Sequence, residues 1–246
     1  PGWRYNLYCT VQFDMVSRIH IIAKRPIQMQ QRNLTEHVSL SGETELSGKA
    51  LKVLQAARKV FLAHGFSAAT TDMIQREAGV SKSTVYAHFI NKEALFTAVI
   101  KSECTAFTRA LHNIRFQPGR LKETLSILAR TYLDVVLSPS GLALYRVAIA
   151  ESARFPALAH TFYRAGPQVS ARLVADLLAG ASQSGEVNFG DTSLEAVACM
   201  FVNLVRSELQ LQYLTYPDSP PSAEQIETWV TNVVTLFMRA YGGGDK

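Results

Sequence analysis

The 246-residue chain carries 25 lysine and arginine residues against 20 aspartate and glutamate residues, a formal net charge of +5, and 48% of its residues are apolar. This composition is typical of globular proteins with a sizeable core and excludes a wholly disordered chain. The three cysteines, Cys9, Cys104 and Cys199, are too far apart for a CxxC pair, and no apolar run is long enough to span a membrane. We therefore expect a cytoplasmic protein without a disulfide framework, bound metal, cofactor or membrane partner.

Residues 1–45 differ in pattern from the rest of the chain. Two short segments, YNLYCTVQF and RIHIIA, have strand character, and a polar stretch rich in turn formers follows them. Because no partner strand is evident and an isolated hairpin is only marginally stable, we expect a disordered or loosely attached extension. Two alternatives remain open: an over-extended gene start with the true start near Met29, or a DNA-reaching arm that uses the basic residues Arg4, Arg18, Lys24, Arg25 and Arg32.

The first well-patterned helix is predicted over residues 47–64. Its apolar side chains recur every three or four residues, as one face of an amphipathic helix requires: Ala50, Val53, Leu54, Ala57, Val60 and Phe61. Gly65 is expected to end this helix, because glycine enters a left-handed conformation at little steric cost.

The stretch TTDMIQREAGVSKSTVYAHFINK, residues 70–92, predicts two short helices joined by a tight turn. Thr70 or Thr71 can cap the first helix with a hydroxyl oxygen, Gly79 can end it, and Ser81 can cap the second. The second helix presents small hydroxyls, lysine, tyrosine and histidine on its outer faces. Two helices across a glycine turn, with a polar second helix, are typical of a helix-turn-helix that contacts DNA.

Residues 51–100 resemble the DNA-binding domain of the TetR/AcrR (tetracycline-repressor-like) family. The matching positions occur in one ungapped order: Ala56, Phe61, Gly65, Phe66, Thr70, Thr71, Ile74, Ala78, Gly79, Val80, Ser81, Tyr86, His88, Phe89, Lys92, Glu93, Ala94 and Leu95. The resemblance implies an all-α fold, with a three-helix helix-turn-helix domain at residues 46–92 followed by a helical ligand-binding and dimerisation domain at 114–246. It also implies a DNA-binding transcriptional regulator, most often a repressor.

The resemblance places residues 81–88 in the major groove of double-stranded DNA. Hydroxyl, lysine and imidazole groups can contact base edges or phosphates. The expected contacts are Thr70, Thr71, Ser81, Lys82, Ser83, Thr84, Tyr86, His88 and Lys92. Thr70 could also serve only as a helix cap, and His88 only as a packed, hydrogen-bonded histidine.

The basic residues concentrate in the segment that contains the helix-turn-helix. Residues 46–104 carry eight lysine and arginine residues and four acidic ones, whereas residues 105–246 carry 12 of each. A local basic excess favours binding to phosphates through counterion release, although a merely solvated face has the same charge.

Helices are predicted for the rest of the chain. Asn91 can cap a long helix over residues 91–113, which the resemblance implies is the link between the two domains. Further helices are predicted at 120–137, 141–153, 156–164, 167–184, 191–215 and 222–241. The segment LYRVAIAESARFPALAHTFYRAGP, residues 144–167, resembles the C-terminal domain of the AefR-like branch of the same family.

The last two predicted helices, 191–215 and 222–241, are apolar over more than one stripe. One stripe can face the core of the monomer, and the other requires a partner. A two-fold interface of four helices would satisfy it and agrees with the resemblance. The residues expected at this homodimer interface are Val197, Phe201, Val205, Trp229, Val233 and Phe237, and the alternative is a buried terminal hairpin.

The resemblance implies an apolar cavity for a small, lipophilic effector in the C-terminal helices. The expected lining residues are Phe107, Leu128, Tyr132, Tyr145, Arg146, Ala148, Phe162, Tyr163 and Phe201. Each of them also fits ordinary core packing or an ion pair. A protein partner that controls DNA binding in place of a small molecule is the open alternative, and a C-terminal domain without a cavity would favour it.

Enzyme signatures are missing from the sequence. It contains no P-loop, GxSxG, HExxH or GxGxxG pattern. We therefore predict a homodimeric, ligand-responsive regulator that binds a palindromic operator and has no catalytic site.

Overall fold

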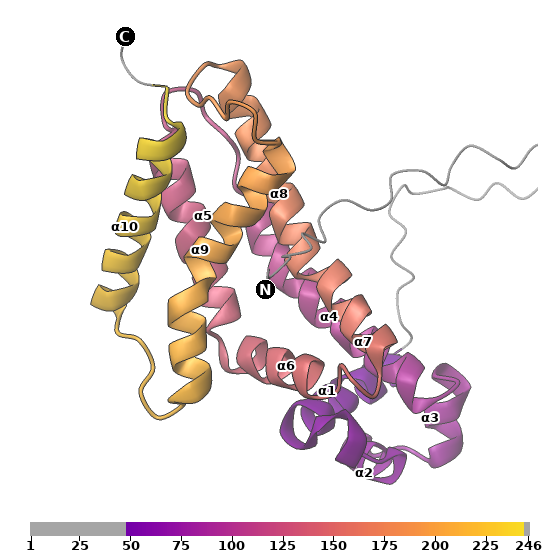
Figure 1. Cartoon of the computed structure of the whole chain (residues 1–246). Coiled ribbons are helices and arrows are strands. Elements are labelled where there is room, and N and C mark those ends of the chain that lie inside the picture. Colours follow the sequence, from indigo (N-terminus) through magenta and orange to yellow (C-terminus); the bar gives the residue numbers. More distant parts are fainter. Residues whose placement is uncertain (1–47, 244–246) are drawn as a thin grey trace, which may run out of the picture. The chain divides into compact units, whose positions relative to one another are not determined.

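The computed structural model describes residues 48–243, which form an α-helical fold (Figure 1). In chain order the helices are α1 (Gly48–Ala68), α2 (Thr71–Ala78), α3 (Lys82–His88), α4 (Lys92–His112), α5 (Leu121–Val136), α6 (Pro139–Ala150), α7 (Pro156–Ala165), α8 (Pro167–Gln183), α9 (Leu194–Thr215) and α10 (Ala223–Tyr241). The only β-type pairing in this range is an isolated bridge between Val187 and Gly242. The predicted all-α fold class is confirmed. The expected extension at residues 1–45 lies outside the described residues.

The caps predicted for α2, α3 and α4 are present. The Thr70 hydroxyl accepts a hydrogen bond from the Met73 N–H at 3.2 Å, and the Ser81 hydroxyl accepts one from the Thr84 N–H at 3.2 Å. The Asn91 side chain accepts from the Ala94 N–H at 2.7 Å. Each cap satisfies a backbone donor that the first turn of a helix leaves without a partner.

Two glycines mark the ends of helical segments in the three-helix unit, α1 to α3. Gly79 follows α2 with φ 63° and ψ 36°, a left-handed conformation that other residues rarely adopt. Gly65, with φ 76° and ψ 172°, interrupts α1 as predicted, but the chain resumes helical geometry and continues to Ala68. The interruption lets Phe66 turn into the core, where it is fully buried.

The buried side chains form two clusters. One joins α1, α2, α3 and the first half of α4, and it includes Leu144, Val147 and Leu158 from α6 and α7. The other joins α5, α8, α9 and α10. Helix α6 therefore packs directly against α1, beside which it lies in Figure 1, and α7 packs against α4 and α6.

By length and composition, no single helix in the described range could cross a membrane. Helices α5 and α6, which meet at a 68° bend, are together long and apolar enough, but buried helices in globular cores also meet this test of length and composition.

Candidate nucleic-acid interface and ligand cavity

Helix α3 presents a polar outer surface. Lys82, Ser83, Tyr86 and His88 are exposed, whereas Val85 is buried against the core of the three-helix unit. The exposed position of His88 contradicts the alternative of a packed, hydrogen-bonded histidine. The exposed face combines a cation, hydroxyls and an imidazole, all of which can contact phosphate or base edges.

The hydroxyls at the start of α3 bond to one another. Ser81 Oγ lies 2.8 Å from Ser83 Oγ and 2.8 Å from Thr84 Oγ1. Thr84 is only half-exposed, and its hydroxyl is held within this cap. Ser83 is exposed and therefore the more accessible hydroxyl for a contact outside the protein.

Side-chain contacts brace α3 against α2. Lys82 Nζ forms an ion pair with Asp72 Oδ1 at 3.0 Å, and the hydrogen bond and charge of Asp72 raise the pKa of Lys82. The Tyr86 hydroxyl lies 3.5 Å from the hydroxyl of Thr71. These contacts orient the two helices relative to each other and leave the Lys82 side chain about half exposed.

Lys92 does not extend into solvent as a phosphate contact would require. Its ammonium donates to the carbonyl oxygens of Phe66 at 2.9 Å and Ala69 at 3.0 Å, lies 3.5 Å from that of Ser67, and lies 4.4 Å from the centre of the Phe66 ring. The expectation for Lys92 is therefore corrected. An ammonium has three N–H donors, and the carbonyl oxygens at and just after the end of α1 engage them.

Ion pairs neutralise part of the basic excess in this region. Arg58 pairs with Glu103 at 2.7 Å and Lys59 with Glu77 at 2.8 Å, in addition to Lys82 with Asp72. Within residues 48–104, the cations without an ion pair that also lie outside the Lys92 site are Lys49, Lys52, Arg76 and Lys101. The charge count therefore overstates the number of free cations.

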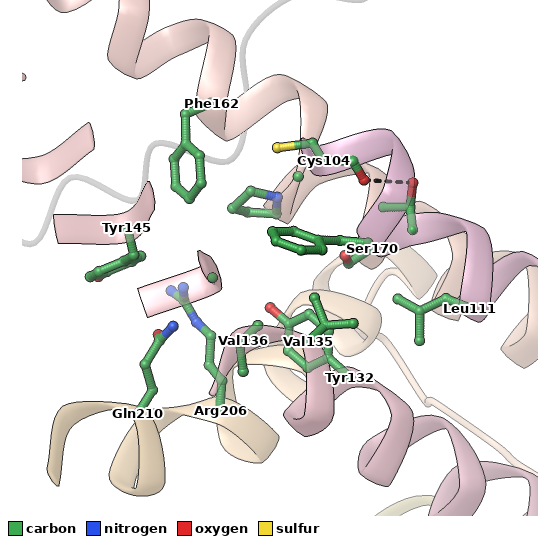
Figure 2. A pocket seen from close by; sticks show the side chains of 15 residues that line it. Cys104, Leu111, Tyr132, Val135, Val136, Tyr145, Phe162, Ser170, Arg206 and Gln210 are labelled. Atoms are coloured by element: carbon green, nitrogen blue, oxygen red, sulfur yellow. Dashed lines mark hydrogen bonds between the residues drawn. The ribbon is translucent and has the colours of Figure 1, made fainter. Parts of the chain in front are cut away.

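A cavity lies among α4, α5, α6, α7, α8 and α9 (Figure 2). Its open and enclosed space together amount to about 500 Å³, and its lining residues are Cys104, Phe107, Thr108, Leu111, Tyr132, Val135, Val136, Gly141, Tyr145, Phe162, Gly166, Pro167, Ser170, Arg206 and Gln210. Four of the predicted residues, Phe107, Tyr132, Tyr145 and Phe162, line it. The rings of Tyr145 and Phe162 meet edge to face, with centroids 6.2 Å apart.

The other five predicted lining residues lie elsewhere. Leu128 and Phe201 are buried in the cluster of α5, α8, α9 and α10, and Ala148 is buried without lining the cavity. Arg146 and Tyr163 are exposed. The chain pattern identified apolar helices correctly but could not determine which face of each helix meets the cavity.

Several polar lining residues were not predicted from the sequence: Thr108, Ser170, Arg206 and Gln210. Arg206 and Gln210 lie four residues apart on α9 and therefore project from one face of that helix. Figure 2 shows both side chains rising from the same ribbon into the cavity. The spacing of four between an arginine and a glutamine was the available signal, although Asn203, Ser207 and Glu208 make the same stretch of α9 polar on other faces.

Burial changes the acidity of two lining residues. Desolvation raises the pKa of the Tyr132 hydroxyl to about 12, against a smaller lowering by Arg206. Desolvation, aided by Glu103, raises the pKa of the Cys104 thiol to about 12. At neutral pH the phenol is thus a hydrogen-bond donor, and the thiol is not a nucleophile.

The expected dimer-interface residues belong largely to the core of the monomer. Five of them, Val197, Phe201, Val205, Val233 and Phe237, are at most 5% exposed. Trp229 is half-buried, and its indole N–H donates to the Val205 carbonyl oxygen at 2.8 Å. This set is therefore corrected: the stripe selected from the sequence faces inward.

Other apolar side chains on the last two helices are exposed. They are Met200 (49%), Leu204 (39%) and Leu211 (59%) on α9 and Leu236 (57%) on α10. Met200, Leu204 and Leu211 follow one stripe of α9, because they are four and seven residues apart.

The end of α6 is bonded to the end of α1. The Glu151 carboxylate accepts hydrogen bonds from the backbone N–H and the hydroxyl of Ser67, both at 2.7 Å. The Phe155 ring meets the Phe66 ring edge to face at 4.7 Å. Helix α6 thus lines the cavity through Gly141 and Tyr145, and its C-terminal cap, Glu151, bonds to the end of α1, just before the helix-turn-helix.

Comparisons with known proteins agree with this arrangement. A family model described as bacterial regulatory proteins of the tetR family matches residues 53–99, and one described as the C-terminal domain of AefR-like transcriptional repressors matches residues 123–243. The HTH-type transcriptional regulator UidR of Escherichia coli K12 is 27% identical over 150 residues, which are 59% of this chain and 72% of UidR.

Solved structures resemble the whole described range. The flavonoid-responsive regulator FrrA is 36% identical, with a TM-score of 0.69, over 80% of this chain and 98% of FrrA. A TetR-family regulator from Mesorhizobium loti is 26% identical, with a TM-score of 0.70, over 81% of this chain and 100% of that one. These relatives are regulators of transcription rather than enzymes. The chain therefore belongs to the TetR family of DNA-binding transcriptional regulators and has an AefR-like C-terminal domain.

Proposed function

We propose that this protein is a homodimeric repressor that binds a palindromic operator and releases it when a small aromatic molecule occupies the cavity. The observation that carries this proposal is the position of α6, which lines the cavity and bonds to the end of α1 through Glu151. Residues 46–92 would form the DNA-binding domain and residues 114–246 the effector and dimerisation domain of a cytoplasmic protein.

The DNA contacts are assigned to α3 and the start of α2. Ser83, Lys82 and Tyr86 have exposed side chains suited to the major groove, with His88, Thr70, Thr71, Ser81 and Thr84 beside them. Selection from a random DNA pool should return an inverted repeat whose half-sites are one helical turn, about 34 Å, apart. Recovery of sequences without two-fold symmetry would contradict this assignment.

The exposed apolar stripe on α9 and α10 is assigned to the dimer interface. Met200, Leu204, Leu211 and Leu236 provide the uncovered apolar surface that a partner subunit would bury. Leu204→Glu should convert a dimer into a monomer in light scattering. Ile149→Glu, at an exposed apolar position on α6, is the matched control and should leave the dimer intact. A monomeric parent protein would refute the assignment.

Effector control would follow from differential binding. A ligand can release DNA only if it binds the DNA-bound conformation more weakly, and a coupling of about 1–3 kcal/mol gives roughly 5–150-fold weaker operator binding. The aromatic walls Phe107, Tyr132, Tyr145 and Phe162 suit a planar ligand. The name of FrrA, a flavonoid-responsive regulator, is consistent with this ligand class.

The test is operator affinity with and without compounds shown to bind the protein. Fluorescence anisotropy with the selected operator should show weaker binding in the presence of flavonoids or simple aromatic acids. Val135→Phe, which narrows the cavity, should abolish this response and spare DNA binding. If the operator affinity is the same with and without every compound that binds, small-molecule control is rejected and control by a protein partner is favoured. The cavity is the observation that argues against a protein partner.

A further inference from the structure

The cavity is lined mostly by apolar side chains but also contains several polar ones. Arg206 and Gln210 enter it from one face of α9, and Tyr132 and Ser170 enter from α5 and α8. No aspartate or glutamate lines it. The formal charge contributed by its lining is therefore positive, which distinguishes this cavity from a purely lipophilic one.

Arg206 is positioned but not neutralised. Its Nε donates to Asn203 Oδ1 at 3.2 Å on the same helix, and its guanidinium carbon lies 5.9 Å from the centre of the Tyr145 ring. Across residues 48–243 it forms no ion pair with a carboxylate. Asn203 and Tyr145 thus hold one edge and one face of the guanidinium, and the terminal Nη groups remain available. The half-buried position reduces competition from water.

Three buried neighbours also retain unused hydrogen-bonding capacity. Gln210 is 5% exposed, Tyr132 4% and Ser170 4%. No side-chain hydrogen bond within the described part of the chain involves the Gln210 amide, the Tyr132 hydroxyl or the Ser170 hydroxyl. Their polar groups line the cavity, so they can bond there to water or to the acceptor group of a ligand. All three can donate to an acceptor oxygen, and Arg206 can do so with a charge.

We propose that the cavity binds a planar aromatic anion, in which a carboxylate or phenolate oxygen is held by Arg206 and Gln210 and the rings lie between Tyr145, Phe162 and Phe107. This inference rests on the proposed function and names the chemical class of its effector. A guanidinium recognises a carboxylate through parallel N–H···O bonds, and charge-assisted bonds of this kind are the strong ones. The edge-to-face pair of Tyr145 and Phe162 supplies the aromatic wall.

Other ligand classes fit the lining less well. A cation would meet Arg206 without a carboxylate to balance it. A hydrocarbon would leave Arg206 and Gln210 desolvated without partners, which costs more than its contacts with the apolar wall would return. A covalent adduct on Cys104 is disfavoured, because its thiol stays protonated at neutral pH.

The test compares matched anionic and neutral probes by isothermal titration calorimetry on the full chain. The pairs are 2-naphthoate with 2-naphthamide, for a carboxylate, and 7-hydroxyflavone above its phenol pKa with unsubstituted flavone, for a phenolate. The variants are Arg206→Met, which removes the charge, and Arg206→Lys, which keeps the charge but loses the fork. Arg172→Met, an exposed arginine on α8 outside the cavity, is the matched control.

The parent and Arg172→Met should bind at least one anion roughly 10- to 100-fold more tightly than its neutral partner, as a charge-assisted bond predicts. Arg206→Met should remove that preference while binding the neutral probe as before, and Arg206→Lys should retain part of it. Unchanged affinity for the neutral probe distinguishes lost recognition from misfolding. The pair that shows the preference identifies carboxylate or phenolate as the group.

Equal affinity for both members of each pair, or a preference that survives in Arg206→Met, would overturn the inference. So would the failure of all the anions to bind. Operator affinity measured with the same probes separates this outcome from failure of the proposed function. If anions bind through Arg206 but the operator affinity is unchanged, the site assignment stands and the regulatory function fails. If only neutral probes release the operator, the regulatory function stands and the anion site fails.

Discussion

Replacing Lys92 with methionine should destabilise the protein and leave the salt dependence of DNA binding almost unchanged. The Lys92 ammonium bonds to the Phe66 and Ala69 carbonyl oxygens at 2.9 and 3.0 Å and lies over the Phe66 ring. It therefore acts as a C-terminal cap of α1 at the point where the chain turns into α2. Methionine retains most of the apolar stem but cannot donate.

The expected loss follows from these contacts. Hydrogen bonds from a charged donor contribute about 1.5–3 kcal/mol each, and a cation over an aromatic face about 0.5–1 kcal/mol when partly exposed. Lys92 is only half-buried, so water replaces part of this stabilisation. We expect Lys92→Met to lower the free energy of unfolding by about 2 kcal/mol, which is less than the sum of those contributions because water solvates part of the site.

Urea denaturation at a fixed protein concentration measures the stability. Operator titrations at about 50 to 200 mM salt, a range in which affinity depends strongly on salt, measure the slope of log affinity against log salt concentration. A phosphate contact would contribute roughly 0.9 to that slope, whereas a helix cap contributes none. Lys101→Met, an exposed lysine on the same helix, is the matched control and should change stability little. Unchanged stability together with a slope reduced by about one would refute the cap and restore the phosphate contact.

Three further changes test local features of the structure. Gly79→Ala should lower the free energy of unfolding by about 1 kcal/mol in urea, because φ is 63° and no neighbour crowds the position, whereas Gly48→Ala should not. Glu151→Gln should speed hydrogen exchange at the Ser67 amide, since it weakens a charged acceptor, and exchange no faster than in the parent would contradict the contact. Native Cys104 should resist iodoacetamide at pH 8, well below its pKa of about 12, and react once urea exposes it, as mass spectrometry would detect.

The sequence by itself determined the helices and their ends. Thr70, Ser81 and Asn91 were identified as caps because a cap depends on one side chain and the next three residues. Gly79 was identified as a terminator because its conformational freedom is a local property. The ungapped order of matching residues in the helix-turn-helix also sufficed to indicate a regulator of this family. These conclusions needed no knowledge of distant contacts.

Only the tertiary structure shows which face of a given helix is covered by a neighbouring helix and which face is exposed. Helix α9 is apolar on several sides, so its sequence could not show that Phe201 and Val205 face the core while Met200 and Leu204 face outward. Only the fold brings Arg206 of α9 opposite Tyr145 of α6 and leaves it without a carboxylate in the described range. Helical periodicity defines stripes but not their partners, because burial depends on the surfaces that residues far apart in the chain present to one another.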